Sequence, residues 1–445
     1  MIFCQKDFAN NKKCSTFALD FKGRKSCKSL GAWRSWLAHL HGVQGVESSS
    51  LFAPTDLKER DLVSKPLFFF IPTALQKIDM EKTIGISQRI TALRWFTMLL
   101  VVLAHAVQVF AFAPYTLPEV QPSDIEMGDG YRFIQSFVLY GMVVGLVPVF
   151  FMISGYLQFL KERSYWCEVG KKTKGLLLPM LVWTALAIVA YWCLKPWLGE
   201  CLSFAFTKSK NPWDWVTAVF GSYKNVLTAG AGVPLLYQCW FIRDLFLLTL
   251  FFPVIRWLLR RIPIPFLIVC AVVWIGEFHP MVAGEALFFY SVGALCGMKK
   301  FDFFEAIDRT CPWWFVIAAC IVSVSVMYVK LDYLQVTNNA LVYIPTILLL
   351  IKLSGLFCKR AKVYGFLEKM SSQSMFLYCA HGNYLIVVLL VFAMRLFDVG
   401  TLGGLILGVL FIVVLDVVLC SAAGMLLERF APRTFSLLTG GRSKK

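Results

Sequence analysis

The chain has 445 residues, of which 58% are hydrophobic and 16% are charged, and its mean hydropathy is +0.66. Soluble domains are closer to one half apolar and one quarter charged, so these values exclude a single soluble globule. The 39 Phe and 14 Trp are equally incompatible with a disordered or low-complexity chain. The composition therefore predicts a polytopic membrane protein.

The formal net charge is 44 − 27 = +17, but Lys and Arg lie in short clusters between apolar runs. This distribution indicates membrane topology rather than nucleic-acid binding. Half of the 14 cysteines lie in or beside apolar runs, and no CxxC pair is present. We therefore expect reduced cysteines, with no structural disulfide and no metal site. The seven cysteines are Cys193, Cys239, Cys270, Cys296, Cys320, Cys379 and Cys420.

Residues 1–79 differ from the rest in being polar and basic, without an apolar run of membrane length. Their one apolar patch, Leu67–Ile71, is bounded by Pro66 and Pro72 and is too short for a span. One hypothesis is a mis-annotated start, because 31–55 resembles the conceptual translation of a tRNA gene and Met80 directly precedes the first span. The alternative is a disordered cytoplasmic arm.

A helix needs about 20 apolar residues to cross the hydrocarbon core. Stretches of roughly this length predict an all-α membrane domain over 80–430 with ten transmembrane helices, followed by a basic cytoplasmic tail at 431–445. The ten stretches are about 90–112, 133–160, 175–197, 237–258, 264–278, 281–298, 313–330, 339–358, 372–395 and 402–427. The fifth and sixth are short and share a turn at His279–Pro280.

The positive charges alternate with these spans. With the amino end inside, each cytoplasmic segment carries Lys or Arg, whereas the first outer loop is acidic, with Glu119, Asp124, Glu126 and Asp129. The positive-inside rule then places both termini in the cytoplasm.

Two outer segments, about 113–132 and 198–236, are longer than simple turns. The second, with the residue that follows it, carries aromatic residues that suit the faces of sugar rings, namely Trp213, Trp215, Tyr223 and Tyr237. Interfacial Trp and Tyr are also the ordinary aromatic belt of a membrane protein, so both interpretations stay open.

The first predicted span contains two ionisable residues, Arg94 and His105, eleven positions apart. On an α-helix this spacing places them on nearly the same face, about 16 Å apart along the axis. An ionisable group inside a span costs at least ~2.5 kcal/mol, so its presence favours a functional site. Alternatively, Arg94 extends to the cytoplasmic boundary and His105 is a packing residue.

His381 is a second histidine near the middle of a predicted span. Two histidines inside one membrane domain indicate proton chemistry, unless each is only a hydrogen-bonded helix contact facing its own direction. Arg243 and Asp244 are adjacent, so they project about 100° apart and are expected to need partners elsewhere. Glu285 lies near the predicted outer mouth, where solvation is the alternative to a role, and Asp416 lies mid-span without an evident partner.

Three lysines, Lys171, Lys172 and Lys174, directly precede the apolar run 175–197. A helix start at this point would offer free N–H groups to the phosphates of a nucleotide-like donor. An ordinary positive-inside cluster explains the same residues.

Six segments, in order over about 86–430, together resemble the acyltransferase 3 family of integral membrane acyltransferases, and most closely its sugar O-acetyltransferase-like branch. The segments are Arg94 to His105, Val149–Leu157, Lys171–Pro179 with Trp183, Trp240–Phe246, Phe289–Ala294 and Ser374–His381. The loop after the second span has Lys161 and Arg163 but lacks the paired arginines of some branches.

The resemblance implies acetyl-CoA or another acyl-CoA as donor substrate, with no bound cofactor. The acceptor would be a hydroxyl of a lipid-linked or cell-surface glycan, and the location the bacterial cytoplasmic (inner) membrane. His105 would be the catalytic histidine, with Arg94 as its partner and His381 as a second catalytic histidine. The candidate substrate-binding residues are Arg94, Ser154, Lys171, Lys172, Lys174, Trp240, Arg243, Asp244 and Glu285.

An acyl thioester is already activated, so its transfer needs a base for the acceptor hydroxyl and stabilisation of the oxyanion. Direct transfer is the expected mechanism and an acyl-histidine intermediate the second. Ser154 is a candidate covalent carrier or, more simply, a helix-packing residue. A flippase or exporter of lipid-linked saccharides, without acyl transfer, is the alternative function.

Overall fold

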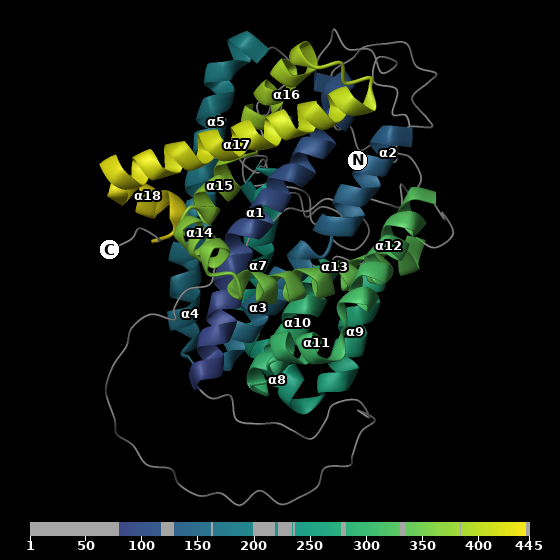
Figure 1. Cartoon of the computed structure of the whole chain (residues 1–445). Coiled ribbons are helices and arrows are strands. Elements are labelled where there is room, and N and C mark those ends of the chain that lie inside the picture. Colours follow the sequence, from purple (N-terminus) through teal and green to yellow (C-terminus); the bar gives the residue numbers. More distant parts are fainter. Residues whose placement is uncertain are drawn as a thin grey trace, which may run out of the picture.

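The computed structural model describes residues 80–116, 129–161, 163–198, 219–220, 234, 236–276, 282–329, 335–382 and 384–441. Within these residues every regular element is a helix (Figure 1). The predicted extension 1–79, the turn at His279–Pro280 and the aromatic residues Trp213, Trp215 and Tyr223 lie outside the described residues. The prediction of an all-α membrane domain is confirmed for the described part of the chain.

Four helical stretches are long and apolar enough to cross a membrane: Gly85–Phe110, Gly130–Leu160, Tyr165–Ala190 and Leu402–Phe430. The first belongs to α1 (Met80–Thr116) and the last to α17 (Leu402–Phe430). The second combines α2 (Asp129–Gln135), the π-helix η1 (Ser136–Val143) and α3 (Leu146–Leu160). The third combines α4 (Tyr165–Lys172), the π-helix η2 (Thr173–Leu177) and α5 (Leu178–Leu198).

Three further apolar stretches are bent pairs of helices, which raises the number of candidate spans in the described residues to seven. The pairs are α11 (Phe303–Thr310) with α12 (Trp313–Val329) at 92°, α13 (Gln335–Cys358) with α14 (Ala361–Ser371) at 110°, and α15 (Ser374–Ala380) with α16 (Tyr384–Leu396) at 70°. Two shorter apolar helices, α9 (Pro263–Ile275) and α10 (Gly284–Met298), add to these. The number of ten spans stays a prediction.

The predicted span 237–258 is divided rather than continuous. It consists of a 3-10 turn η5 (Tyr237–Cys239), α7 (Trp240–Leu250) and α8 (Phe252–Arg261), with the break at Phe251. Pro253 lies in the first turn of α8, where its missing N–H is tolerated, and it cannot donate the bond that would continue α7.

α1 is central to the bundle and packs against α13, α14, α15, α16 and α17, the last of which crosses it (Figure 1). α3 and α10 pack most closely of all. A methyl group at Gly155 would lie 2.1 Å from the Tyr290 carbonyl oxygen, and one at Gly293 would lie 1.9 Å from that of Met152. Small residues permit this approach of two backbones inside a membrane.

The predicted tail is helical where it is described. α18 (Pro432–Thr439) packs against α5 and α17. Phe435 is fully buried and stacks on Phe376, with ring centroids 6.0 Å apart. This segment therefore belongs to the folded domain.

Candidate functional site

The two predicted histidines come together. His105 lies on α1 and His381 directly follows α15, and the centroids of their rings are 5.3 Å apart. His381 is fully buried, while His105 is partly buried. The alternative in which the histidines face different directions is therefore wrong.

The hydrogen bonds of the rings define where each carries its proton. Nδ1 of His381 lies 2.9 Å from the Leu377 carbonyl oxygen, which can only accept, so Nδ1–H is the donor. Nδ1 of His105 lies 3.2 Å from Oε1 of Gln108 and donates in the same way. In a neutral ring the other nitrogen, Nε2, then carries the lone pair. Both Nε2 atoms are buried without a hydrogen-bond partner among the described residues, so the site presents two neighbouring proton acceptors.

A glutamine that sequence reasoning missed lies beside this pair. Gln238 is fully buried, and its Nε2 donates to the Cys379 carbonyl oxygen at 3.3 Å. Its Oε1 has no hydrogen-bond partner among the described residues. The Tyr378 hydroxyl donates to the Gln238 main-chain oxygen, which ties the segment before α7 to α15. A buried, unpaired carbonyl oxygen is costly and offers an acceptor to a ligand hydroxyl.

Tyr237, one of the aromatic residues noted with the second long outer segment, also lies at the site. Its ring meets that of His105 edge-on, with centroids 4.8 Å apart. Tyr237 and Gln238 stand just before the motif Trp240–Phe246. For Gln238, closeness to that motif is a sequence signal that could have drawn attention to it.

Arg94 lies on α1 and Ser154 on α3. Arg94 is partly buried on α1, three turns before His105. Ser154 is buried on α3 next to Gly155, at the close contact with α10, and its Oγ has no partner among the described residues. This position agrees with the packing interpretation of its motif.

Arg243 and Asp244 have the partners elsewhere that their projection predicts, and in addition they pair with each other, which the sequence did not predict. Arg243 Nε lies 2.9 Å from Asp244 Oδ1, so the long arginine side chain reaches its neighbour. Arg243 also donates to the Phe220 carbonyl oxygen at 2.7 Å, and Asp244 Oδ2 accepts from the Ala283 N–H at 2.9 Å. The buried pair therefore joins α7 to two other segments. Trp240 is buried beside Phe151, with ring centroids 6.3 Å apart.

Glu285 is 7% exposed at the first turn of α10, so the alternative of a solvated carboxylate is wrong. Asp416, buried on α17, accepts from the Cys420 thiol at 3.2 Å. This partner lies one turn along the same helix. Asp416 Oδ2 has no partner among the described residues.

The lysine cluster does not lie at a helix start. Lys171 and Lys172 end α4, Lys174 lies in η2, and the helical stretch continues into α5. The N–H groups here bond to preceding carbonyls, for example that of Thr173 to Val169 and Gly170. The prediction that free N–H groups at a helix start bind phosphates here is therefore wrong, although Lys171 and Lys174 are exposed.

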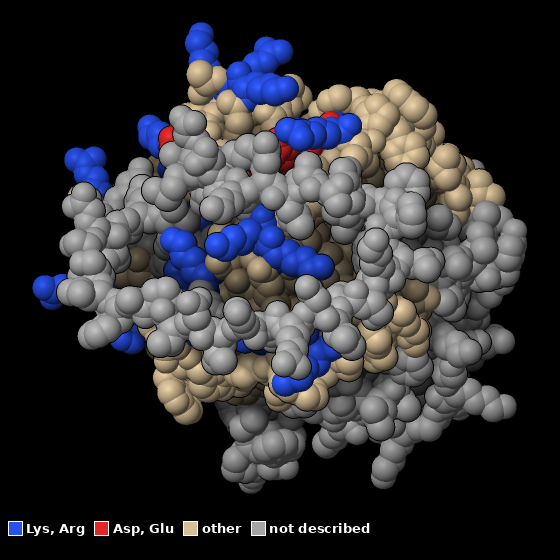
Figure 2. All heavy atoms as spheres, turned by 90° about the horizontal axis from the view of Figure 1, so that it is seen from below, with Lys and Arg blue, Asp and Glu red and all other residues tan. Residues whose placement is uncertain are grey.

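Positive charge gathers at one end of the molecule. The start of α1 lies at the lower end, together with α4 and α8 (Figure 1). Seen from that side, Lys and Arg predominate over Asp and Glu among the described residues (Figure 2). A basic face of this kind is what the positive-inside rule expects on the cytoplasmic side.

Over its described residues the fold is that of a helical membrane protein, and its site is a pair of histidines whose Nε2 atoms are buried. The chain matches the family described as Acyltransferase domain over residues 87–425. It therefore belongs to this family, as the resemblance implied, and is a multi-pass membrane acyltransferase.

One relative is the succinoglycan biosynthesis protein ExoH of Rhizobium meliloti (strain 1021), 29% identical over 123 residues. The similar segment is 26% of this chain and spans only 30% of that relative's length. No solved structure matches the chain.

Proposed function

We propose that the protein transfers an acetyl or other short acyl group from acyl-CoA in the cytoplasm to a hydroxyl of a cell-surface or lipid-linked sugar. In this proposal it lies in the bacterial inner membrane with ten spans and both termini cytoplasmic. The glycan acceptor is supported by the relative named for succinoglycan biosynthesis. The cytoplasmic side is supported by the basic face of the molecule.

The observation that carries the proposal is the pair of buried, unpartnered Nε2 atoms of His105 and His381. His105 Nε2 takes the proton of the acceptor hydroxyl as its oxygen attacks the thioester carbonyl. The C–S bond then breaks, and the coenzyme A thiolate takes the proton from His105. The ester and free coenzyme A leave, and the imidazole is neutral again.

Other residues have supporting roles in this scheme. Gln238 Oε1 accepts a hydrogen bond from the acceptor sugar and orients it toward the histidines. Arg94 interacts with the negatively charged donor, and the exposed Lys171 and Lys174 attract its phosphates by charge alone. Arg243 and Asp244 have a structural role, because they bind each other and main-chain groups of two other segments.

The test measures release of coenzyme A from acetyl-CoA by purified full-length protein, with thiol detection and mass spectrometry of the acceptor glycan. We expect His105→Ala to lower release by about 10²–10⁴-fold, the usual contribution of a general base, while eluting from size exclusion like the wild type. A folded His105→Ala protein that still releases coenzyme A at the wild-type rate would refute the proposal. A flippase would move lipid-linked saccharide without releasing coenzyme A and would tolerate this substitution.

A further inference from the structure

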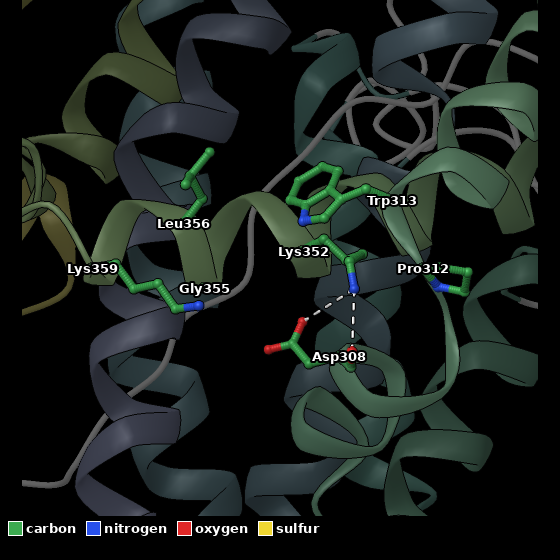
Figure 3. Close-up of a pocket in the computed structure, with 7 residues that line it drawn as sticks. All are labelled: Asp308, Pro312, Trp313, Lys352, Gly355, Leu356 and Lys359. Atoms are coloured by element: carbon green, nitrogen blue, oxygen red, sulfur yellow. Dashed lines mark hydrogen bonds and ion pairs between the residues drawn. The ribbon is translucent and has the colours of Figure 1, made fainter.

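A second polar site lies where two of the bent helix pairs break. α11 and α12 meet across Cys311 and Pro312, and α13 and α14 meet across Lys359 and Arg360. A pocket with a volume of about 430 Å³ lies at these breaks (Figure 3). It is lined by Asp308, Pro312, Trp313, Lys352, Gly355, Leu356 and Lys359.

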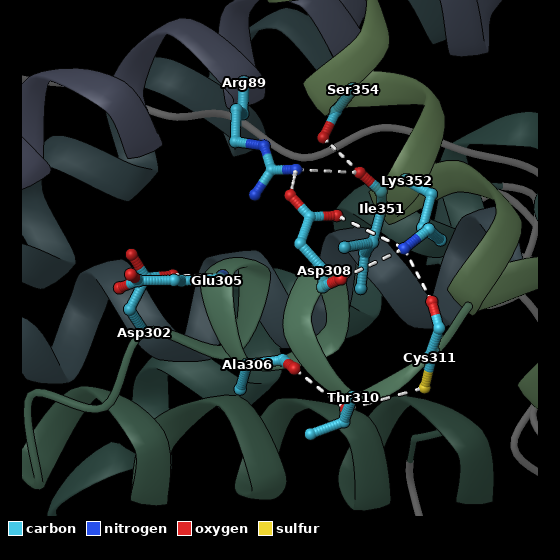
Figure 4. Close-up of polar contacts among 10 residues, drawn as sticks. All are labelled: Arg89, Asp302, Glu305, Ala306, Asp308, Thr310, Cys311, Ile351, Lys352 and Ser354. Carbon is cyan, nitrogen blue, oxygen red and sulfur yellow. Dashed lines mark hydrogen bonds and ion pairs between the residues drawn. The ribbon is translucent and has the colours of Figure 1, made fainter. Parts of the chain in front are cut away.

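Positive charge exceeds negative charge at this pocket. Asp308 binds Arg89 of α1 through Oδ2, and its Oδ1 lies 3.9 Å from Lys352 Nζ (Figure 4). Lys352 is buried, and its Nζ also donates to the carbonyl oxygens of Asp308 at 3.3 Å and Cys311 at 2.6 Å. The pocket lining contains two cations, Lys352 and Lys359, and one carboxylate, Asp308, a formal charge of 2 − 1 = +1. Arg89, which pairs with Asp308 from outside the lining, adds further positive charge behind it. Such a pocket favours an anion.

The two breaks also mark changes from polar to apolar sequence. α11 carries Glu305, Asp308 and Arg309, whereas α12 contains no Asp, Glu, Lys or Arg. α13 ends its apolar run at Cys358, directly before Lys359. A change from polar to apolar sequence at both breaks is expected if the breaks lie at the membrane–water boundary.

Large apolar side chains beside the pocket face outward. Trp314 is 71% exposed at the start of α12, and Leu356 of α13 is 42% exposed. Trp313 lines the pocket itself, with its ring 5.5 Å from Lys352 Nζ. A soluble phosphate compound would leave this apolar surface uncovered, whereas the acyl chains of a lipid cover it.

We propose that this pocket binds the headgroup phosphate of an anionic phospholipid, whose acyl chains lie along the exposed faces of α12 and α13. Basic pockets between transmembrane helices bind anionic headgroups in this way. The lipid phosphate contacts Lys359 at the rim, and the Arg89–Asp308–Lys352 network holds the base of the pocket. This inference does not depend on the proposed acyl transfer.

The test titrates purified full-length protein with phosphatidylglycerol or phosphatidylcholine of identical acyl chains and counts bound lipids by native mass spectrometry. We expect phosphatidylglycerol to bind more tightly. Lys359→Gln should weaken its binding about fivefold, the effect of one basic side chain near an anionic lipid surface. Lys359→Arg should retain binding. Lys362→Gln, which removes an exposed lysine of α14 that does not line the pocket, is the matched control and should change nothing.

Three results would overturn the inference: equal binding of the two lipids, equal losses in Lys359→Gln and Lys362→Gln, or displacement of phosphatidylglycerol by inorganic phosphate or coenzyme A. The last would assign the pocket to a soluble phosphate compound. Equal binding of the two lipids by wild-type protein would overturn the inference even if a variant failed to fold, and Lys359→Arg keeps the location testable if Lys359→Gln does not fold.

Discussion

Gly382 lies directly against the side-chain amide of Gln238. A methyl group at position 382 would stand 2.5 Å from Nε2 and 2.7 Å from Oε1 of that glutamine. Because Nε2 is already held by the Cys379 carbonyl oxygen, the side chain has little freedom to retreat. The absence of a side chain at Gly382 therefore keeps Gln238 in place next to His381.

We expect Gly382→Ala to lower acyl transfer about 10-fold to 100-fold, because displacement of an orienting group by about 1 Å has effects of this size. The measurement is the rate of coenzyme A release with saturating acetyl-CoA. Gly365→Ala is the matched control, since nothing lies within 4 Å of a methyl group there. Unchanged activity in a folded Gly382→Ala protein would show that the position of Gln238 is irrelevant to catalysis.

The membrane domain and both histidines could be predicted from the sequence because they depend on local features. Apolar length identifies a span, and an ionisable residue within it is conspicuous. The meeting of His105 with His381 could not be derived, because they are 276 positions apart in the chain and come together through the packing of α1 against α15 and α16. Gln238 carries no unusual charge or spacing, so it was missed.

The errors in the candidate site have local physical causes. The lysine cluster followed by Pro179 has the appearance of a helix start, but the helix continues through a π-helical turn in which the Leu178 N–H bonds to the Thr173 oxygen five residues earlier. Arg243 and Asp244 project about 100° apart at their Cα atoms, yet the flexible arginine side chain closes the gap. Backbone direction alone does not settle the contacts of a long side chain.

The two histidines should act as one unit. We expect His105→Ala to lower kcat/KM for coenzyme A release by about 10²–10⁴-fold, the usual contribution of a general base. The double variant His105→Ala/His381→Ala should be within a few-fold of His105→Ala, because groups that act together show strongly non-additive losses. Independent losses that multiply in the double variant would contradict a shared proton function.

The Arg243–Asp244 pair should matter more for stability than for substrate binding. Arg243→Met leaves the buried Asp244 carboxylate without its charge partner, which costs about 3–5 kcal/mol of the free energy of unfolding. Thermal unfolding in detergent measures this loss as a lower Tm. Arg243→Met/Asp244→Leu should recover part of it, since the uncompensated charge is removed. A double variant less stable than Arg243→Met would contradict this account.

Arg94 should act mainly on the donor. Arg94→Gln removes a cation from α1 but leaves His105 and its Gln108 hydrogen bond intact. We therefore expect the KM for acetyl-CoA to rise about 10-fold to 100-fold, the range for a lost hydrogen bond to a charged group, with the acceptor KM unchanged. Steady-state kinetics with each substrate varied in turn measure both values.

Lys171→Gln is the matched control for Arg94→Gln, because Lys171 is exposed and contributes only long-range attraction in the proposal. It should raise the KM for acetyl-CoA by less than about fivefold, and the effect should vanish at high salt because exposed charges are screened. Arg94→Lys should restore part of the donor affinity, since it keeps the charge but not the planar fork of donors. An Arg94→Gln protein with a normal KM for acetyl-CoA and a raised acceptor KM would place Arg94 on the sugar side instead.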